Sequence, residues 1–113
     1  MSERFMIVRD DGIIEVLGTQ VTDGVAYRWK VHTPVSRPSR GVVAYLRRWE
    51  CRPTGEVHHP MEKAECKLVG ARFGVKRITK KLVAEVHDDA VKYGLEWLKE
   101  QQVGFTNNEE VAR

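Results

Sequence analysis

The stretch that decides the fold is Val25-Ala-Tyr-Arg-Trp-Lys-Val-His32, in which large apolar side chains occupy every second position. The apolar set is Val25, Tyr27, Trp29 and Val31, and the set between them is Ala26, Arg28, Lys30 and His32. Successive side chains of a β-strand point to opposite faces of its sheet. The pattern therefore predicts a strand with one apolar and aromatic face and one basic face.

Working outward from this strand, further β-prone runs occupy residues 5–8, 13–17 and 69–75. Asp11-Gly12 separates the first two runs and Asp23-Gly24 precedes the third strand, and Asp-Gly is a strong signal for a hairpin turn. We expect the second strand to end at Gly18 and Thr19. The first three strands are thus expected to form an antiparallel meander.

The middle of the chain is less regular. Residues 33–41 hold two prolines and a glycine and are expected to form a loop. Residues 42–51 fit either a strand or a helix, and their β-branched and aromatic content favours a strand. Arg52-Pro-Thr-Gly55 is expected to turn the chain, and a short helical turn is expected to begin at His58-His59-Pro60.

The last element is expected to be a long amphipathic helix from about Ile78 to Gln102, stopped by Gly104. The residues of its predicted apolar stripe are Leu82, Val83, Val86, Ala90, Tyr93 and Trp97, and His87 is interpreted as a boundary residue. Val91, Leu95 and Leu98 widen the apolar arc beyond what one sheet needs. We therefore expect these three residues to form a self-association surface, giving a homodimer.

These elements predict an α+β fold, in which an antiparallel sheet of four to five strands is packed on one face by the C-terminal helix. At 113 residues the chain is within the range of a single domain, which we place at residues 1–103. Residues 104–113 are expected to form a polar C-terminal tail.

Composition limits the cellular setting. The apolar run from Phe5 to Val8 is too short for a signal peptide, and no segment approaches the roughly 20 apolar residues of a membrane span. Two cysteines, Cys51 and Cys66, do not make a disulfide framework. The expectation is a cytoplasmic protein without a membrane partner.

Positive charge is concentrated in one part of the chain. The whole sequence has a net charge of +3, but residues 28–52 carry seven cations against Glu50 alone. These cations are Arg28, Lys30, Arg37, Arg40, Arg47, Arg48 and Arg52. Such a local concentration of positive charge favours anionic partners.

Aromatic residues are interleaved with these cations. Tyr27, Trp29, Tyr45 and Trp49 supply flat faces on which bases can stack, and cations neutralise phosphates. The simpler alternative is that the aromatics are core and the cations a solvated face, because Tyr27 and Trp29 alternate with Arg28 and Lys30. The sequence leaves both interpretations open.

A second basic run reads Gly74-Val-Lys-Arg-Ile-Thr-Lys-Lys-Leu-Val83, and it resembles the turn and recognition helix of a helix-turn-helix motif. The resemblance implies that Lys76, Arg77, Lys80 and Lys81 face phosphates or base edges. The preceding segment alternates like a strand, which departs from that motif. Lysines at a helix start also oppose the helix dipole, which suggests a nearby anion.

Enzymatic chemistry has little support in the sequence. Cys51, His58, His59 and Cys66 are zinc-ligand types without the usual paired spacing, so we expect no metal and no cofactor. The paired histidines with His87 resemble a ββα-metal nuclease site, but no asparagine lies between them. No phosphate-binding loop, nucleophile elbow or paired carboxylates appear.

The sequence thus predicts a small accessory protein that binds nucleic acid, single-stranded or RNA rather than duplex DNA. The alternative is a regulator or inhibitor that uses the same arginines and aromatics to engage an acidic protein surface.

Overall fold

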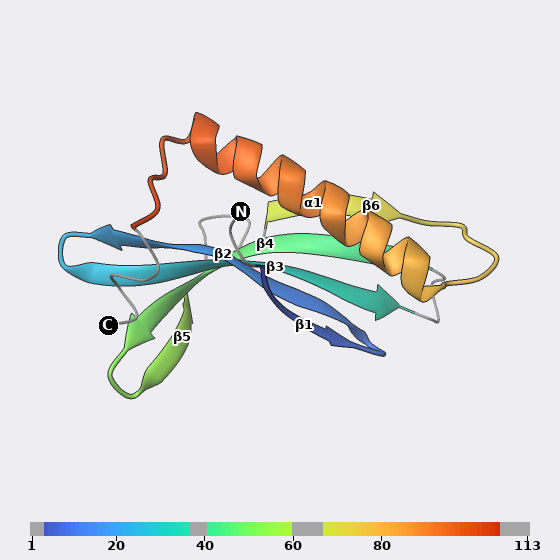
Figure 1. Cartoon of the computed structure of the whole chain (residues 1–113), viewed down its shortest axis with the longest axis horizontal. Helices are drawn as coiled ribbons and strands as arrows, with labels where there is room; N and C mark the ends of the chain where they lie inside the picture. The colour runs from blue at the N-terminus through green and yellow to red at the C-terminus, as the bar shows by residue number, and fades with distance from the viewer. Residues whose placement is uncertain (1–3, 37–40, 60–66, 107–113) are drawn as a thin grey trace.

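The computed structural model describes residues 4–36, 41–59 and 67–106. Its elements, in chain order, are β1 (Phe5–Arg9), β2 (Gly12–Thr22), β3 (Val25–Ser36), β4 (Gly41–Arg52), β5 (Gly55–His59), β6 (Lys67–Arg72) and α1 (Lys80–Glu100). The fold is α+β, as predicted: one antiparallel sheet with a C-terminal helix on one side (Figure 1).

Strands β1 to β5 lie side by side in the order of the sequence, and β6 also pairs with β4. Residues 48–52 of β4 pair with β5, and residues 42–46 of the same strand pair with β6. Strand β3 pairs along the opposite edge of β4. The two short strands therefore share one edge of β4, and Arg47 stands where they meet.

The predicted turns at Asp11-Gly12 and Asp23-Gly24 are confirmed. Gly12 has φ 149°, and a Cβ there would lie 2.5 Å from the carbonyl oxygen of Thr33, so no larger residue fits without a backbone shift. Strand β2 continues past Gly18 to Thr22, contrary to the expected end. The register of β2 against β3 shifts by one residue at a bulge between Val16 and Gly18, and pairing continues beyond it.

The middle of the chain differs from expectation in two places. The strand over residues 42–51 is confirmed, but His58 and His59 belong to β5 and do not begin a helical turn. Gly55, at φ 131°, lets the chain fold back so that residues 55–59 pair with β4. β3 also runs through Pro34 to Ser36, so residues 33–36 are strand where a loop was expected.

The C-terminal helix is confirmed with shorter bounds. It begins after Thr79, whose side-chain hydroxyl accepts a hydrogen bond of 3.1 Å from the backbone N–H of Leu82. It ends at Glu100, before the expected stop at Gly104, and Gln102 adopts a positive φ of 60°. Beyond it, Thr106 pairs with Thr19, and Phe105 packs on Gly18, where a Cβ would lie 2.5 Å from its ring.

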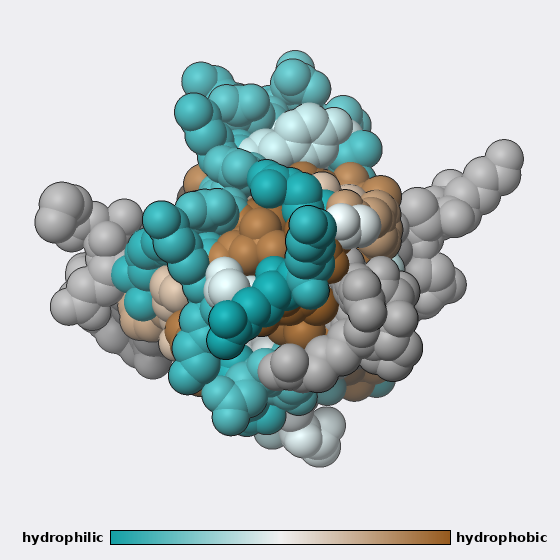
Figure 2. Space-filling model, turned by 90° about the vertical axis from the view of Figure 1, so that its right-hand side faces the viewer, coloured by the Kyte–Doolittle hydropathy of each residue, from teal (hydrophilic) through white to brown (hydrophobic). Residues whose placement is uncertain are grey.

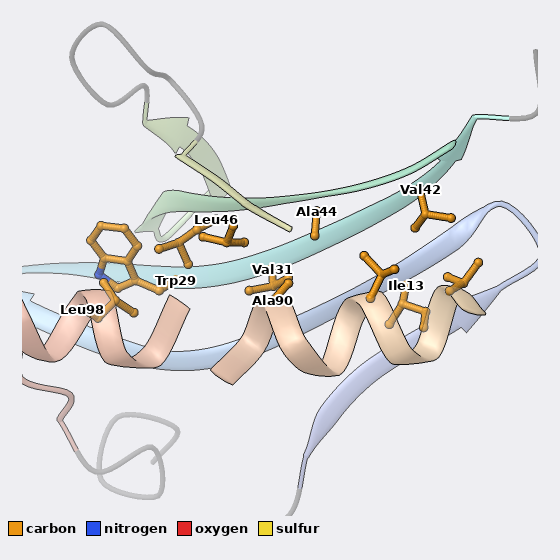
Figure 3. Close-up of a cluster of buried hydrophobic side chains, with 11 residues drawn as sticks. Ile13, Trp29, Val31, Val42, Ala44, Leu46, Ala90 and Leu98 are labelled. Carbon is orange, nitrogen blue, oxygen red and sulfur yellow. The ribbon is translucent and has the colours of Figure 1, made fainter. Parts of the chain in front are cut away.

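The core lies between α1 and the sheet face that it covers (Figure 3). Its buried members are Ile13, Trp29, Val31, Val42, Ala44, Leu46, Val69, Val83, Val86, Ala90 and Leu98. Burying one such side chain contributes roughly 1.5–3 kcal/mol for residues of the size of Val or Leu. Tyr93, expected in the apolar stripe, is 49% exposed, whereas His87, expected at its boundary, is fully buried.

The core reaches the surface at the end of the molecule where α1 begins. Figure 2 shows hydrophobic atoms there, framed by hydrophilic ones. A cavity of about 70 Å³ at this end is lined by Val8, Arg9, Asp10, Ile13, Val35, Ile78, Thr79, Lys80 and Val83. Lys80 lies 3.6 Å from Asp10, and this exposed ion pair supplies a nearby anion for the basic helix start.

Candidate nucleic-acid interface

Strands β3 and β4 place two different sets of side chains on the two faces of the sheet. Trp29, Val31 and Leu46 point toward α1 and are buried. Side chains alternate along a strand, so the positions between them face away from α1. The register pairs Arg28 with Trp49, Lys30 with Arg47 and His32 with Tyr45. We term these six side chains the open-face cluster.

The open-face cluster is half-buried, and two of its three cations lie over its aromatic rings. Lys30 Nζ is 5.1 Å from the ring centroid of Trp49, and Arg47 Cζ is 5.5 Å from that of Tyr45. A contact of this kind contributes about 0.5–1 kcal/mol when exposed. The cations are thereby held on the sheet surface instead of extending into solvent.

One carboxylate interrupts the positive charge. Glu56 of β5 forms ion pairs with Arg28 and with Lys30, the latter with an N–O distance of 2.5 Å. Burial alone would raise the pKa of Glu56, but the hydrogen bonds and charges of Lys30 and Arg28 outweigh it and hold the pKa below its usual range. Glu56 is therefore charged at neutral pH and neutralises part of the cluster.

Several members of the open-face cluster, together with Glu56, line a hollow in the sheet surface. Its volume is about 330 Å³, and it is lined by Ile14, Lys30, His32, Arg47, Trp49 and Glu56. Burial lowers the pKa of His32, and the charge of Arg47 lowers it further, against an opposing effect of Asp11. The hollow thus combines apolar walls, two cations, a neutral imidazole and a carboxylate.

Trp29 lies in the core, on the α1 side of the sheet, and not with the other predicted site residues of β3. Trp29 is 4% exposed and packs edge-to-face on Trp97, with ring centroids 6.4 Å apart. Its Nε1 donates a hydrogen bond of 3.1 Å to Gln20 Oε1. Trp29 therefore lies apart from the outward-facing residues with which the sequence grouped it, because the strand alternation that places Lys30 outward places Trp29 inward.

Two predicted arginines lie elsewhere on the sheet. Arg48 is on the α1 side, with its guanidinium 4.5 Å from the ring of Tyr27, so it does not join the open-face cluster. Arg52 is exposed at the end of β4 and forms an ion pair of 3.1 Å with Glu50. Arg37 and Arg40 lie outside the described residues.

The second basic run does not form a helix-turn-helix. Residues 73–79 form an irregular connection after β6, and α1 begins only at Lys80. Lys76 and Arg77 are exposed in this connection. The open-face cluster lies on the sheet face opposite α1, so we infer that these two cations do not act with it.

Sequence reasoning missed three members of the site. His32 continues the alternation of β3 and could have been included on that signal alone. Ile14 could be placed only once the register of β2 against β3 was known. Glu56 has no local signal, since it reaches the cluster only because β5 folds back on β4.

A second polar group is buried between the sheet and the helix. His87 Nε2 lies 2.8 Å from Glu15 Oε1, and His87 Nδ1 lies 2.7 Å from Thr33 Oγ1. Arg4 donates to both oxygens of Glu15, at 2.9 and 2.6 Å, and to Asp88 at 2.9 Å. The order hydroxyl, imidazole, carboxylate is that of a catalytic triad, but Thr33 and His87 are 0% exposed. This chain of bonds joins α1 to the sheet.

The predicted self-association residues do not form one surface. Leu98 is 1% exposed and belongs to the core, Val91 packs partly against the core, and Leu95 is 41% exposed. A surface for a second copy would therefore have to be built without Leu98.

Metal ligands are not gathered in the described residues: across 4–36, 41–59 and 67–106, no group of three or more His, Cys, Asp or Glu side chains could hold an ion. Cys51 is a free, half-buried thiol. The other predicted ligands, the side chains of His58, His59 and Cys66, lie outside what the structure describes.

Among the described residues, no helix is long and apolar enough to cross a membrane. Comparison of the chain with protein-family models, with curated proteins and with solved structures gives no match. Function must therefore be argued from the geometry of the chain itself.

Proposed function

We propose that the protein binds single-stranded nucleic acid, RNA or DNA, on the sheet face that carries the open-face cluster. The observation that supports this most is the register of β3 and β4, which puts a cation, an aromatic ring or an imidazole at six adjacent positions. Cations neutralise phosphates, and flat rings accept unpaired bases. A single-strand site needs phosphate neutralisation and base stacking side by side, and the open-face cluster offers cations and rings on one surface.

The cluster has the dimensions of a short oligonucleotide site. At about 3.3 Å per residue, Arg28 to His32 cover roughly 13 Å along the strand. A sheet that stacks exposed bases on aromatic side chains is a recurrent solution for single strands. In a duplex the bases are already stacked and paired, so Tyr45 and Trp49 would contribute nothing. Single strands are therefore the preferred class.

The test is fluorescence anisotropy with labelled 12-nucleotide single strands and a 12-base-pair duplex, each at 50 and 200 mM salt. We expect the single strands to bind more tightly and to lose affinity at the higher salt. No binding of single strands below about 100 μM at the lower salt would overturn the proposal.

Two variants connect the binding to the surface. Trp49→Leu keeps an apolar side chain but removes the stacking face, and should weaken binding by about tenfold. Lys81→Ala removes an exposed cation of α1 and serves as the matched control, with little expected change. Equal losses of affinity in both variants would show that binding does not depend on the open-face cluster.

The acidic-protein alternative is separated by nuclease treatment. A partner captured on the protein from a cell extract should be released when RNA and DNA are digested. Retention of the partner after complete digestion, together with no oligonucleotide binding, would favour an acidic protein surface.

A further inference from the structure

Arg47 occupies a distinctive place in the sheet. The edge of β4 that carries β5 and β6 changes partner between Leu46, which pairs with Lys67, and Arg48, which pairs with His59. Arg47 lies at this junction and, through the alternation of β4, faces away from α1 into the hollow.

The cations around the hollow differ in their partners. Lys30 is engaged by Glu56, as is the neighbouring Arg28. Arg47 forms no ion pair within the described part of the chain. Its guanidinium instead makes a cation–π contact with the ring of Tyr45. Its Nε is buried there without a hydrogen-bond partner.

An unpaired buried donor is a sign of a missing acceptor. Buried polar groups in folded proteins nearly always have a hydrogen-bond partner, because leaving one unpaired costs free energy. A guanidinium offers a planar fork of donors that matches two oxygens of one phosphate. Arg47 is therefore the cation around the hollow that is most ready to bind an added anion.

The remaining lining suits a base. Ile14 and Trp49 provide apolar and aromatic contact, and about 330 Å³ is at the small end of the range for ligand sites. A hollow of this size has room for one nucleotide. His32 stands beside Arg47, and a phosphate bound there would raise the pKa of His32, which burial and Arg47 hold below its usual value.

We propose that the hollow is a subsite for one nucleotide of the bound strand, with Arg47 holding its phosphate and Trp49 and Ile14 contacting its base. This inference rests on the proposed function, since it makes one nucleotide of the bound nucleic acid the anchor of the complex. The rest of the strand would follow the open-face cluster with weaker, exchangeable contacts.

The probe is a single nucleotide. We expect 5′-AMP, titrated into ¹⁵N-labelled full-length protein and followed by NMR, to shift the backbone amide signals of Arg47 and Trp49 at millimolar concentration. Inorganic phosphate should bind at the same place more weakly, and adenosine more weakly still. If phosphate binds as tightly as 5′-AMP, the base has no subsite and the proposal is overturned.

Arg47→Lys tests the anchor, because lysine keeps the charge and loses the planar fork. We expect its affinity for 5′-AMP to fall about tenfold, whereas Arg52→Ala, which removes an exposed arginine of the same strand, should leave affinity unchanged. Equal affinity in wild type and Arg47→Lys would overturn the proposal. Should Arg47→Lys not fold, Ile14→Trp fills the hollow from the neighbouring strand and should abolish the 5′-AMP shifts.

The two proposals fail in different ways. Binding of the 12-nucleotide strand without any shift by 5′-AMP at 10 mM would overturn the subsite and leave the interface standing. Absence of binding by both probes would overturn the interface and the subsite together.

Discussion

His87 of α1 and Glu15 of β2 are joined by a contact of 2.8 Å between Nε2 and Oε1, although 72 residues separate them in the sequence. An ionised carboxylate can only accept, so Nε2 donates its proton to Glu15, and Nδ1 on the other side of the ring lies 2.7 Å from the hydroxyl of Thr33. Arg4 completes the group by donating to Glu15 from the edge of the sheet. The helix is thus held to the sheet by directional bonds as well as by apolar packing.

Glu15→Ala should destabilise the fold by about 3 kcal/mol, because it leaves His87 without its acceptor in a buried place and removes the partner of Arg4. Urea denaturation measures this as a lower midpoint with an unchanged slope. Glu85→Ala, on the exposed face of α1, is the control and should change stability by less than about 0.5 kcal/mol. Similar effects of the two changes would show that the buried contact adds nothing.

The same carboxylate should make the fold sensitive to acid. Burial raises the pKa of Glu15, but hydrogen bonds from Arg4 and His87 outweigh it and hold the pKa below its usual range. The unfolded chain, with a pKa near about 4.3, then binds more protons, so stability is complete above that value and falls as pH drops toward the folded pKa. Urea midpoints between pH 6 and pH 3 should decline in the wild type and decline less in Glu15→Gln.

Glu56→Gln should strengthen binding of single strands by releasing Arg28 and Lys30 for phosphates. Each additional phosphate contact adds about 0.7 to the slope of log affinity against log salt for a single strand, so the slope should steepen by up to about 1.4. Anisotropy at four salt concentrations measures it. Glu96→Gln removes one negative charge from the exposed side of α1 and should change neither affinity nor slope; weaker binding by Glu56→Gln would mean that Glu56 positions the cations productively.

Binding should also depend on pH through His32. Lys30 and Arg47 from the sheet, Glu56 from β5, Asp11 from the first turn and His87 from α1 are the charged or titratable groups around it. A bound phosphate raises the pKa of His32, so affinity should rise as pH falls through the pKa of the complex and level off below that of the free protein. His32→Gln should flatten the dependence between pH 8 and pH 5; an unchanged profile would exclude His32 from the site.

Much of the fold was predictable from local pattern. The alternation of residues 25–32 predicts β3 and both of its faces, and Asp-Gly turns predict the order of the first three strands. The helix follows from its apolar spacing. The helical turn expected from His58 and His59 is wrong, because pairing with β4, a tertiary event, decides the conformation of this short segment.

The site was only partly predictable for the same reason. Arg28 and Lys30 follow from alternation within one strand, but their grouping with Arg47 and Trp49 requires the register of β3 against β4. Composition alone groups Arg48 and Trp29 with the site. Each lies one position from an outward-facing residue, so strand alternation turns both toward α1. Glu56 and the burial of His87 depend on contacts between distant segments and have no local signature.

Leu98 and Leu95 provide the final test, because the sequence assigned both to a self-association surface. Leu98→Ala should destabilise the fold by about 2–5 kcal/mol, since Leu98 is 1% exposed and its loss leaves a cavity in the core. Leu95→Ala, at 41% exposure, should cost less than about 1 kcal/mol. Urea denaturation, with light scattering of each variant at 50 μM, separates the two roles. If the wild type is a dimer and Leu95→Ala is a monomer of similar stability, the outer side of α1 binds a second copy; if all three are monomers, that side faces solvent.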